Sequence, residues 1–279
     1  MGHGAGKDLY TRLAGSLDRL TTRAPCNEAF LAILAELYSR EEAETVSRMP
    51  AGLSTLDILV RTTGIPGPRL RETLEQAADK GLVLDFHLHG SWHYAPSPFI
   101  IGLFEFTMMR TGQGCDYRKW AGLFRDYLGG SDVYYRANCS GRHHVAPMRT
   151  MPHEEALADY VEVLDYERAR QVVEHGDRFA LGVCSCRHEK HHLGRKECPA
   201  PLANCTSMGM AADYLVRHRM AREADKSEIL EVLAQSRELG LVFNADNVQR
   251  KVSFICHCCS CCCNALAGIT TWGYANTLV

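Results

Sequence analysis

The strongest constraint on this chain is an octapeptide at residues 256–263, C-H-C-C-S-C-C-C, in which six of eight residues are cysteine. A second group of cysteines lies upstream, in the pattern C-x-C, then eleven residues, C, six residues, C. The ten cysteines of the two groups are Cys184, Cys186, Cys198, Cys205, Cys256, Cys258, Cys259, Cys261, Cys262 and Cys263. Only Cys26, Cys115 and Cys139 of the 13 cysteines in the 279-residue chain lie elsewhere, and we expect no common role for them.

Cysteines in such numbers have four possible roles. Disulfides are disfavoured, because the chain begins without the apolar segment of a secretory signal and thiols stay reduced in the cytoplasm. A structural zinc site usually takes two C-x2–4-C pairs, and neither group is a clean match. Metallothionein-like storage does not fit the large core that 46% hydrophobic residues indicate. Iron–sulfur clusters, which commonly take four cysteine thiolates per 4Fe-4S unit, are the best interpretation, with zinc as the alternative.

Cysteine spacing alone leaves the division of the thiols among clusters open. The upstream four, expected on one continuous loop, are enough for one 4Fe-4S cluster, and the octapeptide is enough for a second. Alternatively, both groups share one larger centre.

Cations fill the segment between the second and third cysteines. These residues are Arg187, His188, Lys190, His191, His192, Arg195 and Lys196. Because positive charge stabilises a thiolate-ligated cluster, we predict that Arg187 and His188 contact the cofactor, while some of the others form a solvated loop face. His188 and His257 are also alternative ligands, although ten nearby thiols make this less favoured.

The N-terminal part has the pattern of a winged helix. Helical spacing of apolar residues is expected through residues 1–27, 30–38 and 41–49. A helix capped by Ser54 or Thr55, a turn at residues 64–68 and a second helix over 69–80 then lead to an alternating segment that turns at residues 89–91, which predicts a hairpin. We therefore expect a winged-helix-like domain over residues 1–98.

The remainder predicts a helical connector over residues 99–157, with a loop at 131–147. Residues 158–279 are expected to form a small α/β cysteine-rich iron–sulfur domain. Within it, we predict a helix ending near Gly176, a strand over 178–184, a helix over 208–218, a capping box from Asp225 to Glu228 before a helix over 229–239, a strand over 241–243 and a polar turn at 244–247. The fold class is thus α+β and mostly helical.

Charge and hydropathy argue against nucleic acid and membranes as partners of this chain. The net charge is −2, and the cations of the expected recognition helix (residues 69–80) are balanced by acids, so nucleic acid is not an expected partner. The apolar runs near residues 99–104 are too short to cross a membrane, and a cytoplasmic location is the expectation.

The cysteine motifs resemble those of 4Fe-4S ferredoxin-type iron–sulfur binding proteins of anaerobic bacteria and archaea. That family typically shows C-x-C-R-H, C-x6-C and C-N-C-C-G-C-C-C, and here His257 replaces the asparagine and Ser260 the glycine. Family members often continue into a module with C-x2-C-x2-C-x3-C-P runs, which this sequence lacks, so we expect either a short member or a fragment.

The resemblance implies electron transfer with a redox partner, either a ferredoxin-type protein or an oxidoreductase subunit. It names no substrate, and the sequence contains no P-loop, no G-x-G-x-x-G and no G-x-S-x-G motif that would indicate a catalytic centre. A redox-sensing winged-helix transcription regulator and a structural zinc protein are the alternatives.

Overall fold

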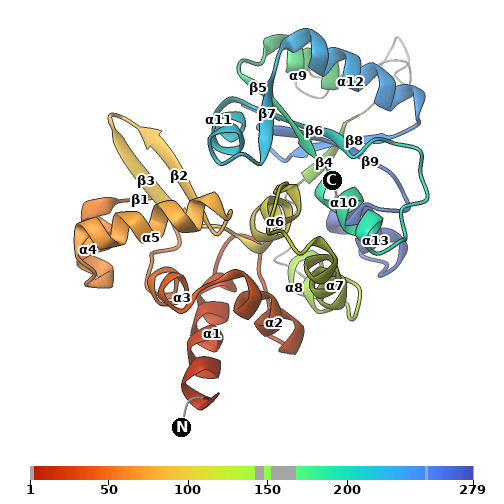
Figure 1. Ribbon diagram of the computed structural model, residues 1–279. Coiled ribbons are helices and arrows are strands. Elements are labelled where there is room, and N and C mark those ends of the chain that lie inside the picture. The colour runs from red at the N-terminus through yellow and green to blue at the C-terminus, as the bar shows by residue number, and fades with distance from the viewer. Residues whose placement is uncertain (1–2, 142–147, 152–167, 249–250, 279) are drawn as a thin grey trace. The chain divides into compact units, whose positions relative to one another are not determined.

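The computed structural model describes residues 3–141, 148–151, 168–248 and 251–278 (Figure 1). The chain divides into two compact units. The first unit comprises residues 1–107 and 116–138, and the second comprises residues 108–115 and 139–279. The residues of the expected connector are shared between these units, and the expected boundary between residues 157 and 158 lies outside the described residues.

The first unit is helical with one small sheet. Its elements are α1 (His3–Leu17), α2 (Glu28–Leu37), α3 (Arg40–Ser47), β1 (Ser54–Thr55), α4 (Leu56–Thr63), α5 (Gly67–Asp79), β2 (Val83–Leu88), β3 (Ser91–Pro96), a helical turn at Phe99–Leu103, α6 (Phe104–Met109), which runs into the second unit, α7 (Tyr117–Leu128) and α8 (Val133–Cys139). Each helix and strand expected between residues 54 and 96 is present, and β1, β3 and β2 form an antiparallel sheet in that order.

Two local signals in this segment form as the sequence predicts. The β2–β3 hairpin turns at His89 and Gly90, whose φ angles of 50° and 80° suit a two-residue turn with both residues left-handed. Pro68 lies in the first turn of α5, where the missing N–H costs no hydrogen bond. Thr55 occupies the N-cap of α4 but its side chain makes no capping hydrogen bond.

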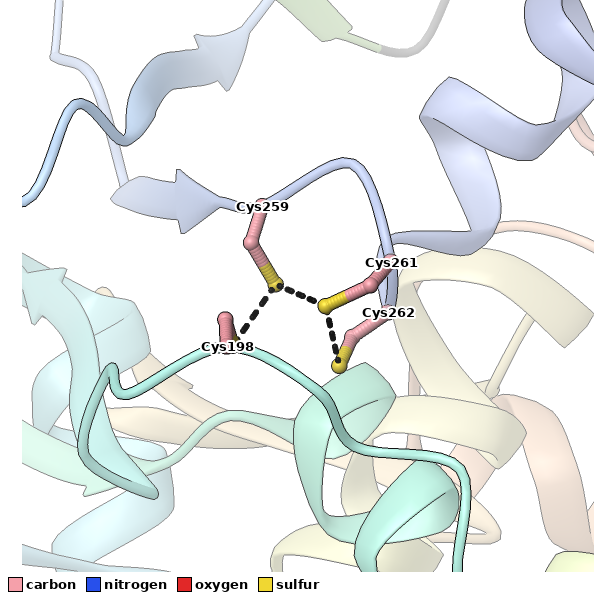
Figure 2. Close-up of side chains that lie close together, drawn as sticks. All are labelled: Cys198, Cys259, Cys261 and Cys262. Atoms are coloured by element: carbon pink, nitrogen blue, oxygen red, sulfur yellow. Dashed lines mark hydrogen bonds between the residues drawn. The ribbon is translucent and has the colours of Figure 1, made fainter.

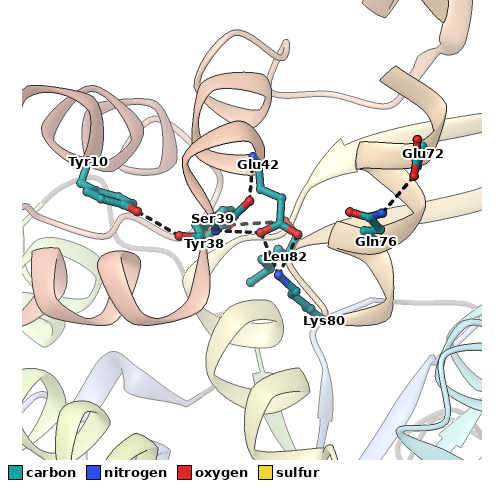
Figure 3. Close-up of polar contacts among 8 residues, drawn as sticks. All are labelled: Tyr10, Tyr38, Ser39, Glu42, Glu72, Gln76, Lys80 and Leu82. Carbon is teal, nitrogen blue, oxygen red and sulfur yellow. Dashed lines mark hydrogen bonds and ion pairs between the residues drawn. The ribbon is translucent and has the colours of Figure 1, made fainter. Parts of the chain in front are cut away.

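A polar network joins α3 to the end of α5 (Figure 3). Ser39 accepts a hydrogen bond from the backbone N–H of Glu42, and the Glu42 carboxylate accepts one from the backbone N–H of Ser39. The same carboxylate, almost fully buried, pairs with Lys80 at 2.9 Å. Tyr38 extends the network, because its backbone oxygen accepts from Tyr10 at 3.0 Å.

The loop expected at residues 131–147 is wrong for its first half, because residues 133–139 form α8. Tyr134 and Tyr135 are buried on this helix, and Tyr134 packs against Phe99 and Tyr127. The segment is largely polar in sequence, so these aromatic contacts and the helix were not predicted. Residues 142–147 lie outside the described part of the chain.

The second unit is built on a six-stranded antiparallel sheet in the order β4-β8-β9-β6-β5-β7. Its elements are β4 (Met148–Met151), α9 (Ala169–His175), β5 (Phe179–Val183), α10 (Ser185–His192), β6 (Ala203–Met208), α11 (Gly209–Arg217), β7 (Ala221–Ala224), α12 (Lys226–Glu238), β8 (Val242–Asp246), β9 (Phe254–Cys258), α13 (Asn264–Thr270) and a short 3-10 turn at Ala275–Thr277.

Helices α9 and α12 cover one face of this sheet (Figure 1). The core beneath them contains Val173 of α9, Ile229 and Leu233 of α12, and alternate residues of the central strands such as Leu181 and Ile255. As predicted, α9 ends at Gly176, and Asp225 caps α12 by accepting a hydrogen bond from the backbone N–H of Glu228 at 2.8 Å.

Two expectations for the second unit are wrong. The upstream cysteines do not lie on one continuous loop, because α10 and β6 form within residues 184–205. The polar turn expected at residues 244–247 is instead largely part of β8, where Asn244 and Asp246 pair with neighbouring strands. No helix in the described ranges combines the length and the apolar character needed to cross a bilayer.

Candidate metal centre

The central strands place thiols on the sheet face opposite α12. Successive side chains of a strand point to opposite faces, so Cys256 and Cys258 of β9 share one face while His257 lies on the other. The ring of His257 contacts Ser236 of α12 at 2.7 Å, which identifies its face as the one that α12 covers. Cys256 and Cys258 therefore point away from α12.

Four thiols from two loops gather closely, and we name them the four-thiol set (Figure 2). Cys198 comes from the loop between α10 and β6, and the other three follow β9: Cys259, Cys261 and Cys262. Their sulfurs all lie within 4.8 Å of one another. The Sγ atoms of Cys198 and Cys259 are 3.4 Å apart, and those of Cys261 and Cys262 are also 3.4 Å apart.

Cys259 is an acidic thiol of the four-thiol set. Hydrogen bonds from the Cys262 thiol, Arg187 and the Cys198 thiol lower the pKa of Cys259 to about 4, although burial opposes this effect. The shared proton resides on Cys262, whose pKa is raised. Because the thiolate is the form of cysteine that binds metal, the set already contains one charged ligand near neutral pH.

Arg187 is a cation of this site, and none of its surface is exposed to solvent. Its Nη1 donates to the backbone oxygen of Pro201 at 2.8 Å and to the side-chain oxygen of Asn204, and its Nη2 donates to the backbone oxygen of His257. Its buried Nε has no hydrogen-bond partner among the described residues. A buried cationic donor beside Cys259 suits a site that holds negatively charged sulfur.

The remaining six of the ten clustered cysteines form a second assembly, which we name the six-thiol group: Cys184, Cys186, Cys205, Cys256, Cys258 and Cys263. Hydrogen bonds run from sulfur to sulfur through five of them, and Cys184 interacts electrostatically with Cys186 and Cys205. Cys256 hydrogen-bonds with Cys205 and Cys258, and Cys263 with Cys258 and Cys186.

One thiol of the six-thiol group is acidic. Hydrogen bonds from Cys256 and Cys263 lower the pKa of Cys258 to about 6. Burial raises the pKa of Cys184, the N-cap residue of α10, to about 12. Each assembly thus surrounds one acidic sulfur with thiols that donate to it.

The two candidate histidines use their rings for structural contacts. His257 is buried between Ser236 and the hydroxyl of Thr206, 3.1 Å from Nε2, and burial lowers its pKa to about 3. The Thr206 hydroxyl donates to the Ile255 oxygen, so it accepts a hydrogen bond from Nε2 of His257. Nδ1 of the neutral ring then accepts a hydrogen bond from the Ser236 hydroxyl. His257 therefore has no ring nitrogen to offer a metal.

His188 is also engaged at both ring nitrogens. Its Nδ1 lies 2.6 Å from the backbone oxygen of Met108 and its Nε2 lies 2.9 Å from Nε2 of His192. A carbonyl oxygen can only accept a hydrogen bond, so Nδ1 of His188 carries the proton. Its Nε2 then accepts a hydrogen bond from Nε2–H of His192. His188 positions α10 rather than contributing a ligand through these atoms.

Sequence reasoning missed three polar residues of the site. Glu189 is fully buried, pairs with Lys190 at 2.8 Å and accepts from Asn264 at 2.8 Å, which ties α10 to the start of α13. Asn204, the third of these residues after Glu189 and Asn264, accepts a hydrogen bond from Arg187. The sequence offered two signals: Glu189 is a single acid within a run of cations, and both asparagines are next to cysteines. Neither pattern is specific. Arg195, by contrast, is exposed, as expected of a loop face.

Comparison with protein-family models, with curated proteins and with solved structures finds no match to this chain.

Proposed function

We propose that the protein is an iron–sulfur redox protein that receives and passes on single electrons. One observation carries this proposal. The fold gathers ten thiols from segments about fifty residues apart into two contiguous assemblies in one unit, each with an acidic sulfur. A single structural ion takes about four ligands and would leave six of these thiols without a role.

The residues present fit such a cofactor. Cysteine thiolates are the usual ligands of 4Fe-4S clusters, and buried hydrogen-bond donors beside the sulfurs adjust the reduction potential. Arg187 supplies positive charge and a hydrogen bond to Cys259, and its buried Nε has no partner among the described residues. A bound cluster would supply one-electron chemistry, and Arg187 would place positive charge beside it.

The redox step moves one electron and no atoms. A reduced partner protein of the ferredoxin or oxidoreductase-subunit type is oxidised by one electron, and an oxidised partner or small molecule later takes that electron up. The cysteine motifs support this assignment through their resemblance to iron–sulfur proteins of anaerobes, and a cytoplasmic location suits reduced thiols.

The first unit is proposed to be a winged-helix-like docking module rather than a DNA reader. The element order and the β1-β3-β2 sheet favour this class. At the α5 helix, Arg69 pairs with Glu41 at 2.6 Å and Lys80 pairs with Glu42 at 2.9 Å. Cations that neutralise acids of the same unit contribute little to phosphate binding, so a transcription regulator has less support.

A structural zinc protein is the second candidate, and the four-thiol set favours it. A tetrahedral zinc ion with Zn–S bonds of about 2.3 Å holds its sulfurs in close contact. Three of the sulfur separations within this set, at 3.4 to 3.7 Å, match that arrangement, and all of them are within 4.8 Å. Zinc at this set alone would still leave the six-thiol group unexplained.

The deciding experiment is metal and acid-labile sulfide analysis after strictly anaerobic purification, with visible spectra before and after dithionite. We expect iron and sulfide in equal amounts, about four of each per cluster, and a brown absorbance that dithionite bleaches. Zinc without sulfide would overturn the redox assignment and establish the second candidate.

A matched pair of variants ties the result to the site. Cys261→Ser is expected to lower the iron content, whereas Cys139→Ser, which removes a buried thiol outside both assemblies, is expected to retain it. Equal iron loss in both variants would show that the assigned thiols do not define the site.

A further inference from the structure

We infer that the second unit holds two separate metal centres, and that the second centre is a polynuclear iron–sulfur cluster bound by the six-thiol group. This inference rests on the proposed function for the identity of the metal. The division of ligands follows from sheet register and sulfur contacts, and it differs from either division that the cysteine spacing suggests. Cys198 groups with octapeptide cysteines rather than with its sequence neighbours. Three octapeptide cysteines group instead with the upstream cysteines.

The register of the sheet places three of these thiols side by side. Thr206 of β6 pairs with Ile255 of β9, so the preceding residue Cys205 lies across from Cys256. Side chains that lie across from each other on paired strands point to the same face, with Cβ atoms about 5 Å apart. Cys258 is two residues beyond Cys256 and shares this face.

Segments outside the sheet bring further sulfurs to the same place. Cys186, in the first turn of α10, and Cys263, the residue before α13, hydrogen-bond to each other through their side chains. Cys263 also contacts Cys258, which connects this pair to the sheet. The result is a continuous line of sulfurs from β6 across β9 to α10.

The extent of this line indicates more than one metal ion. Among the described residues, the four-thiol set is the group whose sulfurs all lie within 4.8 Å of one another. The six-thiol group is more extended, and one ion with metal–sulfur bonds of about 2.3 Å does not reach all its sulfurs. A cluster of several irons bridged by sulfide spans such a distance.

A buried donor without a partner points to the same centre. Asn244 of β8 lies across from Cys256 in the register and is fully buried. Its side-chain oxygen accepts from Thr150 at 3.0 Å, but its Nδ2 has no hydrogen-bond partner in the described part of the chain. An unmet buried N–H group is costly, and the sulfide or thiolate of a cluster on this face would accept it.

The test uses Cys256→Ser and Cys261→Ser, one variant for each centre, in the full chain purified anaerobically. Iron, sulfide and the electron paramagnetic resonance spectrum of the dithionite-reduced protein are measured. Each variant is then treated with iodoacetamide, and alkylation is located by mass spectrometry at every cysteine.

Two separate centres predict complementary losses. Cys256→Ser is expected to lose one part of the iron and one resonance signal, and to expose the remaining six-thiol group to alkylation while the four-thiol set stays protected. Cys261→Ser is expected to do the reverse. Loss of all metal and all protection in both variants would mean one shared centre and would overturn the inference, as would unchanged iron and protection in Cys256→Ser.

Internal controls separate these outcomes from misfolding and from failure of the proposed function. Cys26 is exposed and reports the extent of labelling, while buried Cys139 reports loss of the fold. If Cys256→Ser exposes Cys139, Cys205→Ser provides the same test from the neighbouring strand. Wild-type protein that holds metal without sulfide would reject the iron–sulfur assignment, and the alkylation patterns would still decide between one centre and two.

Discussion

At the scale of single residues, Arg187 is a cation whose side chain is fully buried. A fully buried guanidinium is costly unless its charge and its donors are matched. Here the backbone oxygens of Pro201 and His257 and the side chain of Asn204 accept its hydrogen bonds, and the Cys259 sulfur supplies the opposite charge. The arginine thereby joins the loop after α10, β6 and β9 around the four-thiol set.

Arg187→Gln is expected to destabilise the metal-loaded protein strongly. The shorter neutral side chain leaves buried acceptors without donors, which costs about 2–4 kcal/mol and corresponds to a fall of roughly 10 °C in the melting temperature. Differential scanning fluorimetry of anaerobic protein measures this change. Arg195→Gln is the matched control at an exposed position, and it should shift the midpoint by less than about 2 °C. Equal shifts in both variants would contradict the role given to Arg187.

The nearness of Arg187 to the thiols could be predicted from its place beside the C-x-C motif, because a cation is expected near anionic sulfur. Its three oxygen acceptors could not, since Pro201, Asn204 and His257 reach it only through the loop after α10 and the β6–β9 pairing. His188 was predicted from its motif position to contact the cofactor, and this stays a prediction. Its ring Nδ1 lies at the backbone oxygen of Met108, a residue eighty positions away, which the sequence did not indicate.

Glu105 gives the first unit a predictable pH dependence. Burial raises the pKa of its carboxyl to about 7, even though the backbone N–H of Gly102 donates to it at 3.0 Å. The folded protein therefore keeps a proton that the unfolded chain releases near pH 4.5, and stability falls as pH rises from 4.5 through 7. Glu105→Gln should remove this loss, so the variant gains stability relative to wild type from pH 5 to pH 8.

Urea titrations at several pH values check this expectation. The measured quantity is the difference in free energy of unfolding between Glu105→Gln and wild type. A difference that is constant from pH 5 to pH 8 would show that Glu105 ionises normally in the folded protein.

At the scale of elements, two helix N-caps show which capping residues stabilise their helix. Ser39 and Thr55 are both at N-caps, but only the Ser39 side chain accepts a hydrogen bond from its helix. Ser39→Ala should therefore cost about 1 kcal/mol of stability, and Thr55→Ala should cost less than about 0.5 kcal/mol. Chemical denaturation of both variants measures the contrast, and a Thr55→Ala loss as large as that of Ser39→Ala would refute the assignment of the cap.

Local patterns predicted the elements that depend on local physics. The hairpin at His89 and Gly90, the proline at the start of α5 and the Asp225 cap all formed because a turn or a cap is decided within a few residues. The sheet of the second unit was predicted in part. Strand β6 and strand β9 contain cysteine, asparagine and histidine, so their burial on both faces could not be read from hydrophobic alternation.

Topology also explains why the ligand sets were not predictable. The spacing of the upstream cysteines suggested one loop, but β6 pairs with β5 and β9 and thereby separates Cys205 from Cys198. Cys205 then faces Cys256, while Cys198 remains in the preceding loop and meets Cys259. Pairing between strands about fifty residues apart depends on the whole fold, so it cannot be predicted from the spacing of the cysteines.

At the scale of the whole molecule, the two compact units predict a local response to metal removal. All ten thiols of the two assemblies belong to the second unit, whereas α2–α5 and the β2–β3 hairpin belong to the first. Metal that binds only folded protein adds its binding free energy to the stability of the unit that holds it. Without metal, the second unit loses this stabilising free energy, and the β6–β9 pairing beside the thiols becomes less stable.

Anaerobic chelation should therefore accelerate hydrogen exchange in β6, β9 and α10 by more than about tenfold, a loss of at least ~1.4 kcal/mol in local opening free energy. Exchange in α2, α5 and the β2–β3 hairpin should stay within about twofold of the metal-loaded protein. Mass spectrometry of peptides resolves these segments, and Cys139→Ser protein treated identically controls for changes unrelated to the ligands. Acceleration of equal size in both units would mean that they unfold as one cooperative block, because loss of metal from the second unit would then have released the first as well.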